Sequence, residues 1–145
     1  MHRLSQNDRR RAMTSANLRH NPDAVAPPTQ NLYAHGVEVP TNSRQLYVAG
    51  QVGVRRDGSL PATLEEQVEQ LMANFEAILA SAGMSFADVV KITAYCLKPA
   101  DIITYANIRN RYFNGNPPAT TAVVVAGLAL SEWLVEADLT AAKRD

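Results

Sequence analysis

The 145-residue sequence contains one cysteine, Cys96, and three histidines. A single cysteine excludes an intramolecular disulfide, and a structural zinc site would depend on the three histidines. No apolar run approaches the roughly 18 residues of a membrane span, and the N-terminal segment lacks the apolar region of a signal peptide. We therefore expect a soluble, cytoplasmic protein without a structural metal ion or a membrane partner.

An excess of charge is also lacking, because 14 Lys and Arg residues balance 14 Asp and Glu residues. Proteins that bind nucleic acids normally carry a basic excess, since phosphate contacts drive their affinity. The balance therefore disfavours a nucleic-acid partner, and it also removes a barrier to self-association. Hydrophobic residues make up 46% of the chain, which at this length suffices for one domain with a core.

The first part of the chain differs from the rest in composition. Residues 1–28 are rich in arginine, including three in a row at 9–11, show no hydrophobic periodicity and end in two prolines. We expect this segment to be a flexible basic leader and residues 29–145 to form the domain. Met13 is an alternative start of the protein.

Hydrophobic patterns predict five strands and two helices in the order β-β-α-β-α-β-β. Thr63 and Glu66 match a capping box, an apolar stripe with spacings of three and four follows, and Gly83 supplies a stop signal, which together predict a long amphipathic helix. A second helix is expected over 99–113. The strands are expected over 32–39, 45–54, 89–97, 120–126 and 133–142.

This order predicts an α+β domain with one mixed sheet and both helices on one face, because strand-helix-strand crossovers are right-handed. The other face would stay uncovered, and we expect Val48, Val52 and Val124 to make it apolar. Self-association would cover such a face. Gly50 and Gly53 interrupt the second strand, which indicates a bulge or a close approach of another part of the backbone.

Several short motifs lie in a fixed order over roughly residues 29–142. They are Ala49-Gly50-Gln51, Ala82-Gly83-Met84-Ser85, Asp88-Val89-Val90-Lys91, Asn107, and Pro118-Ala119-x-Thr121 before a valine-rich strand. In their order and spacing, these motifs resemble those of the RidA/YjgF family. The resemblance implies a chorismate-mutase-like fold, assembled as a homotrimer around a central barrel with small-molecule clefts between subunits.

The resemblance also implies chemistry. Active members hydrolyse reactive enamines and imines, such as 2-aminoacrylate, to a keto acid and ammonia without a metal ion or cofactor. When the family's residues are carried over by position, Glu136 is the expected catalytic residue. Four residues are expected to bind substrate: Tyr33, Gly50, Asn107 and Thr120.

Thr120 departs from the family pattern, because the family has a substrate-clamping arginine there and this chain has a neutral hydroxyl. Charge-assisted hydrogen bonds contribute about 1.5–3 kcal/mol each, so we expect a substrate that is not simply anchored by a carboxylate. Arg44, Arg109 or Arg111 could supply a substitute charge from another direction, but nothing in the sequence places them in the cleft, and each is interpreted as a solvated surface residue. A catalytically silent ligand-binding or regulatory trimer is the alternative, and RNA cleavage is disfavoured by the charge balance.

Glu136 and Asp138 alternate with apolar residues and should share one face of the last strand. Glu136 is expected to shuttle protons if burial at a subunit interface raises its pKa, with repulsion from Asp138 acting in the same direction. The alternative is that both belong to the solvated face of an edge strand. His35 and Cys96 are expected to be structural.

Overall fold

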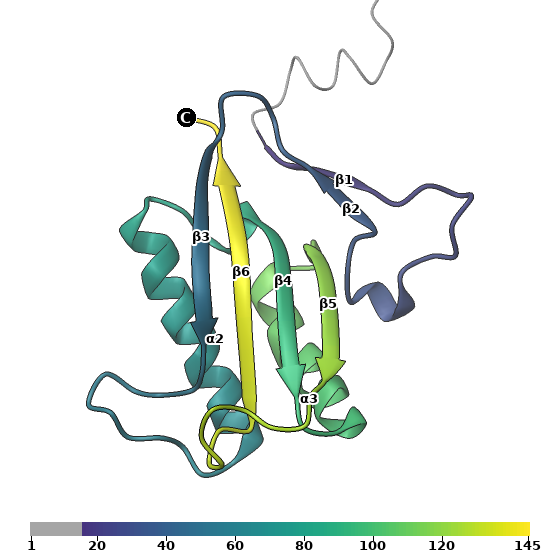
Figure 1. Cartoon of the computed structure of the whole chain (residues 1–145). Coiled ribbons are helices and arrows are strands. Elements are labelled where there is room, and N and C mark those ends of the chain that lie inside the picture. The colour runs from purple at the N-terminus through teal and green to yellow at the C-terminus, as the bar shows by residue number, and fades with distance from the viewer. Residues whose placement is uncertain (1–15) are drawn as a thin grey trace, which may run out of the picture.

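The computed structural model describes residues 16–145, so the arginines at 9–11 and the alternative start at Met13 lie outside the described residues. The elements follow the expected order, with one added strand at the beginning (Figure 1). They are β1 (Leu18–His20), η1 (Thr29–Asn31), β2 (Gly36–Glu38), β3 (Arg44–Gln51), α2 (Leu64–Ser81), η2 (Phe86–Asp88), β4 (Val89–Cys96), α3 (Pro99–Asn110), η3 (Arg111–Phe113), β5 (Ala119–Val124) and β6 (Val135–Lys143).

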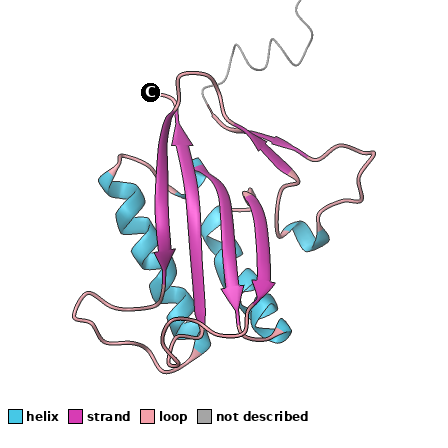
Figure 2. Ribbon diagram, viewed as in Figure 1, coloured by secondary structure: helices cyan, strands magenta, loops and turns pink. Residues whose placement is uncertain are grey.

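The main sheet has four strands in the order β3-β6-β4-β5. β4 and β5 run parallel, whereas β6 is antiparallel to both β3 and β4. α2 and α3 pack side by side on one face of this sheet, and the other face is open (Figure 2). The expected α+β architecture with a mixed sheet and two helices on one face is confirmed.

The first expected strand does not join this sheet as a full strand. β2 pairs antiparallel with β1 in a separate two-stranded sheet that stands beside the main one (Figure 1), and only Ala34 forms an isolated bridge to Ala119. β1 lies inside the expected leader, where the Arg19 side chain donates a 2.9 Å hydrogen bond to the Pro117 carbonyl. A three-residue strand is too short to produce a hydrophobic period, so composition alone missed it.

α2 confirms the most detailed sequence prediction. The Thr63 hydroxyl accepts a 3.2 Å hydrogen bond from the Glu66 backbone amide, a cap that contributes about 1 kcal/mol. Beyond the helix end, Gly83 adopts a left-handed φ of 68° that favours glycine. The helix buries its apolar stripe, which consists of Val68, Leu71, Met72, Phe75 and Leu79.

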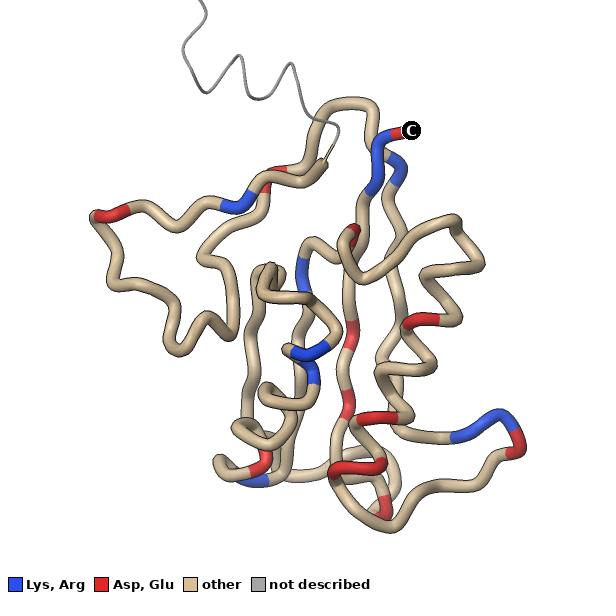
Figure 3. Tube along the Cα trace, turned by 180° about the vertical axis from the view of Figure 1, so that it is seen from behind, with Lys and Arg blue, Asp and Glu red and all other residues tan. Residues whose placement is uncertain are grey.

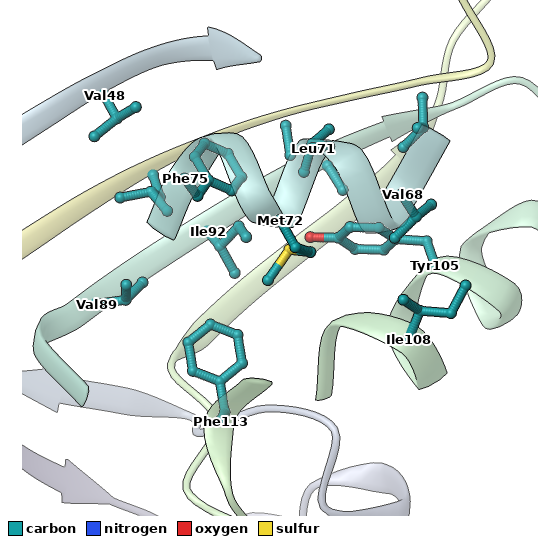
Figure 4. Packing of buried hydrophobic residues seen from close by; sticks show 14 of the residues in the cluster. Val48, Val68, Leu71, Met72, Phe75, Val89, Ile92, Tyr105, Ile108 and Phe113 are labelled. Carbon is teal, nitrogen blue, oxygen red and sulfur yellow. The ribbon is translucent and has the colours of Figure 1, made fainter. Parts of the chain in front are cut away.

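The core lies between the helices and the covered face of the sheet (Figure 4). Phe75 and Leu71 of α2 point toward Ile92 of β4, and Tyr105 of α3 fills the space beside them. Val48 is also buried in this core, so the prediction that it lies on the open face is wrong. Strand alternation explains the error, because Leu46 and Val48 face the helices while Tyr47 between them faces solvent.

The open face of the sheet is consequently more polar than the sequence suggested. Directly opposed strand pairs point to the same side, and two such pairs are Thr93 with Asp138 and Tyr95 with Glu136. Tyr47, which is 75% exposed, lies on this face beside Thr140. An apolar open face therefore no longer argues for self-association, and the trimer is not shown by this single chain.

Candidate functional site

A hollow of about 370 Å³ lies on the open face of the sheet, where the loop before β6 crosses the ends of the strands. The structure brings together in it two residues that the sequence analysis selected, Gly50 and Glu136. Its lining consists of Gly50, Tyr95, Val125, Gly127, Leu128, Ala129, Glu136 and Asp138. Two carboxylates and no basic side chain line the hollow, so it is suited to neutral or positively charged groups.

Gly50 gives Glu136 the room to occupy this position. The pairing of β3 with β6 shifts register between Val48 and Gln51, which makes the bulge that the glycines predicted. A Cβ at Gly50 would lie only 2.5 Å from the Glu136 Oε1 atom. The missing side chain therefore lets the carboxylate lie directly against the backbone of the bulge.

Gly53 lets the backbone of α2 approach closely. A Cβ there would lie 2.5 Å from the Gln67 carbonyl oxygen. The expectation of a bulge or a close backbone approach is thus confirmed at both glycines, by different contacts.

The buried Gln67 side chain fixes the loop that leads into β6. Its amide nitrogen donates to the carbonyls of Pro61 (3.0 Å) and Glu132 (3.1 Å), and its amide oxygen accepts from the Leu134 backbone amide (2.9 Å). These bonds hold the segment that enters β6, and Leu134 lies directly before the strand and two residues before Glu136. Gln67 was not among the expected site residues, although a polar residue beside the apolar stripe of a helix was the available signal.

Tyr95 and Asp138 form a second polar pair in the hollow. The Tyr95 hydroxyl donates a 3.0 Å hydrogen bond to the Asp138 Oδ2 atom. This bond, together with the negative charge of the carboxylate, raises the pKa of Tyr95 above its usual value, so the phenol keeps its proton. Glu136 and Asp138 are the acidic residues of β6, and Figure 3 shows where acidic residues lie along the chain in red. Asp138 was expected only as a neighbour of Glu136, and Tyr95 was not among the expected site residues.

A second group of selected residues lies at the β5 edge, away from the hollow. Thr120 Oγ1 accepts a 2.8 Å hydrogen bond from Arg109 Nη1, and Arg109 Nη2 donates to the Leu32 carbonyl. Tyr33 follows in the same segment, and its ring meets the His35 ring edge-on at 5.6 Å between centroids. The His35 ring nitrogen Nε2 is 2.6 Å from the Ala26 carbonyl, which fits the expected structural role.

Arg109 is only 1% exposed, so its interpretation as a solvated surface residue is wrong. α3 buries it against β5, with the Tyr105 ring 5.5 Å from the guanidinium carbon. Burial lowers the pKa of Arg109 from its ordinary value. Arg44 and Arg111 are exposed as expected, in ion pairs with Asp145 and Glu69.

One chain therefore does not assemble the full set of selected residues. Glu136 faces the open side of the sheet, whereas the Thr120 hydroxyl is bound by a residue of the helix layer, and β4 lies between the two strands. Asn107 is exposed on α3 and belongs to neither group.

Among residues 16–145, no group of three or more His, Cys, Asp or Glu side chains is arranged to hold a metal ion. No helix there combines the length and apolarity that a membrane crossing requires.

The sequence of this chain is similar to those of known proteins. The family model for endoribonuclease L-PSP matches residues 23–143. A 2-iminobutanoate/2-iminopropanoate deaminase from Rattus norvegicus is 35% identical over 105 residues, covering 71% of this chain and 74% of the relative. Protein DfrA from Myxococcus xanthus is 30% identical over 127 residues, covering 83% and 88% of the two chains.

Solved structures agree with these sequence matches. YyfB from Yersinia pestis, a Rid-family protein of unknown function, superposes with a TM-score of 0.79 at 32% identity and covers 87% of this chain and 98% of its own. TdcF from E. coli, solved with bound serine, has a TM-score of 0.65 at 26% identity, with coverages of 86% and 93%. The likeness thus extends over the strands that carry both groups of residues.

Proposed function

The chain belongs to the endoribonuclease L-PSP family, which includes the RidA and YjgF proteins, and we propose that it is a hydrolytic deaminase of reactive imines and enamines. The observation that carries this proposal is the hollow in which the Glu136 carboxylate lies against the glycine bulge of β3. A carboxylate in a partly enclosed space next to a substrate-sized volume is suited to moving protons.

Hydrolysis of an imine needs one water molecule and one proton carrier. The water oxygen attacks the carbon of the C=N bond while Glu136 takes a proton from that water. The proton passes to the nitrogen and gives a carbinolamine. Glu136 then moves the remaining hydroxyl proton to the same nitrogen, and the C–N bond breaks with its electron pair going to nitrogen while the C=O bond forms. The products are a carbonyl compound and ammonia. An enamine first takes a proton on carbon to become the imine, and no oxidant or reductant is needed.

The separation of the two residue groups supports an assembly in which copies complete one another. In this proposal the chain is a homotrimer, and a cleft between subunits brings Tyr33, Asn107 and Thr120 of one copy toward the hollow of the next. Light scattering should then give a mass about three times the 15.8 kDa of the chain. A stable monomer at micromolar concentration would contradict both the assembly and the shared cleft.

A catalytically silent ligand-binding or regulatory trimer is the second candidate, and the neutral Thr120 at the clamp position favours it. Ribonuclease activity is disfavoured, because the zero net charge offers little attraction for phosphates. A cytoplasmic location belongs to the same proposal.

Release of ammonia from freshly generated imines tests the function. The panel should contain 2-iminobutanoate, 2-aminoacrylate and imines without a carboxylate, each compared with its spontaneous hydrolysis. Acceleration of at least one class supports a deaminase. Rates equal to the spontaneous reaction across the panel would favour the silent trimer.

A further inference from the structure

The two carboxylates that line the hollow differ in what they contact. The Asp138 Oδ2 atom accepts a 3.0 Å hydrogen bond from the Tyr95 hydroxyl. Among residues 16–145, no hydrogen bond or ion pair reaches the Glu136 carboxylate, whose Oε1 atom lies where a side chain on Gly50 would begin. One carboxylate is therefore held in place, and the other is free to exchange protons.

The strand pairing produces this difference. Tyr95 lies directly opposite Glu136 between β4 and β6, whereas Asp138 lies opposite Thr93. The Tyr95 side chain therefore runs diagonally over the open face to reach Asp138, a separation that aromatic side chains can bridge. The hydrogen bond to Asp138 and the charge of that carboxylate raise the pKa of Tyr95. The phenol thus keeps its proton and is suited to hold an anion rather than to act as an acid.

Hydrolysis of an imine creates a positive charge beside these groups. The nitrogen of the carbinolamine becomes positively charged when it accepts its second proton, and it keeps this charge until the C–N bond breaks. A fixed negative group stabilises such a charge without having to reorient during the reaction. Glu136 is neutral whenever it carries a proton, so only the second carboxylate keeps a constant negative charge in the hollow.

We propose that Tyr95 is a positioning residue that fixes the Asp138 carboxylate as the counter-ion of the substrate nitrogen, while Glu136 carries the protons. This inference rests on the proposed function and assigns separate roles to the two acidic residues of one hollow. A hydrogen bond to a carboxylate is stronger than one between neutral groups, so the Tyr95 hydroxyl restricts the orientation of Asp138.

The geometry of the hollow fits this division of roles. Residues two apart on one face of a strand are separated by about 6–7 Å, so a small nitrogen group can contact Glu136 and Asp138 together. The second oxygen of Asp138 has no hydrogen-bond donor among residues 16–145 and remains available to that group. No basic side chain lines the hollow, so nothing there competes with the substrate for the two carboxylates.

Equilibrium binding of protonated sec-butylamine tests the inference without requiring turnover. This probe carries a positive nitrogen on a tetrahedral carbon, as the reaction intermediate does, and 2-butanol is its neutral counterpart of similar size. Titrations followed by NMR should show that the wild type binds the ammonium more tightly than the alcohol. Asp138→Asn should reduce this preference by about tenfold, the contribution of one charge-assisted hydrogen bond. Tyr95→Phe, which removes only the hydroxyl, should reduce it in the same direction by about threefold or more.

Tyr47→Phe is the matched control, because it removes the same hydroxyl from another tyrosine of the open face. Tyr47 is 75% exposed and donates its hydrogen bond to Gln45, outside the hollow. This variant should keep the full preference of the wild type for the ammonium, and thermal melting checks the fold of each variant. A wild type without the preference, or a Tyr95→Phe variant that retains all of it, would overturn the inference.

Kinetics on an imine that the protein hydrolyses distinguish positioning from a general structural role. The nitrogen gains its positive charge only after water has added, so Tyr95→Phe and Asp138→Asn should lower kcat and leave KM nearly unchanged. The double variant should be as active as Asp138→Asn alone, because the hydroxyl has no role once the carboxylate is gone. Losses that multiply in the double variant would contradict the positioning role.

The two proposals fail separately. A preference for the ammonium that depends on Tyr95 and Asp138, without ammonia release from any imine, would leave the counter-ion site standing and remove the deaminase. Ammonia release that is the same in the wild type, Tyr95→Phe and Asp138→Asn would leave the deaminase standing and remove the role of Tyr95.

Discussion

The two faces of β6 differ in polarity and in burial. On the side of the helices, Val135, Ala137 and Ala141 are completely buried and contribute to the core. On the open side, Glu136 and Asp138 alternate with them and line the hollow. Because strand residues alternate between faces, one nine-residue segment supports the fold and carries the proposed chemistry.

Gly50, in the last part of β3, and Gly53, just after the strand, also differ in what surrounds them. Gly50 borders the flexible end of a carboxylate, whereas Gly53 borders the backbone of α2. A flexible side chain can move away from an added methyl group at modest cost, but a helix backbone in a packed core cannot. Substitutions on the open side should therefore affect activity, and substitutions on the covered side should affect stability.

The largest expected effect is on the open face. Glu136→Gln keeps the shape of the side chain and removes the charge, so deaminase activity should fall by about 10²–10⁴-fold, the usual share of general acid–base catalysis. Steady-state ammonia release measures this, with thermal unfolding as a check on the fold.

Asp138→Asn is the matched control, because Asp138 lies on the same face but is held by the Tyr95 hydroxyl. It should lower activity less than Glu136→Gln does. Small and equal losses from both variants would indicate that the pair is only a solvated polar face. Loss of assembly in Glu136→Gln would instead indicate a structural role for this carboxylate.

The second prediction belongs to the covered side. Gly53→Ala pushes a methyl group against the Gln67 backbone and should lower the free energy of unfolding by about 1–3 kcal/mol. At this chain length each kcal/mol shifts the melting temperature by about 2–4 °C. Calorimetric melting of the variant checks it, and an unchanged melting temperature would mean that α2 yields more easily than its packing indicates.

Gly50→Ala sharpens the comparison, since it adds the same methyl group three residues earlier. The Glu136 carboxylate must move out of its place, so activity should fall about tenfold, because a displacement of about 1 Å already misaligns reacting groups. Melting should change little, because Gly50 has no left-handed φ and its neighbour is flexible. A large drop in stability with full activity would reverse the assignment of the two glycines.

Sequence patterns predicted the regular elements well, because each carried a local signal. The Thr63 cap, the apolar stripe of α2 and the stop at Gly83 are all readable within one helix. β1 was missed because three residues show no period, and Val48 was assigned to the wrong face because nothing local indicated which face the helices cover.

The candidate site was predicted less completely, because its contacts join residues far apart in the chain. Glu136 and Gly50 came from the family resemblance, and the structure adds the contact between them. Arg109 was misjudged because a helix arginine is usually exposed, and only its packing against Thr120 reveals the burial. Gln67 and Tyr95 act through partners more than 40 residues away, which no local pattern contains.

The last prediction concerns Cys96, which follows Tyr95 in β4 but faces the helices and is completely buried. Burial disfavours the thiolate and raises the pKa of Cys96 to about 11, against about 8.5 for an unfolded thiol. At pH 8 a thiol reagent should therefore label the native protein at least about 100-fold more slowly than the unfolded chain, because only the thiolate reacts. The raised pKa also means that ionisation favours the unfolded state, so this contribution to stability is complete below about pH 8.5 and declines as the pH rises toward 11. Labelling kinetics in native buffer and in denaturant measure the difference. Rapid native labelling would show that the covered face opens more readily than the core packing implies, and that the two faces of the sheet are less distinct than proposed.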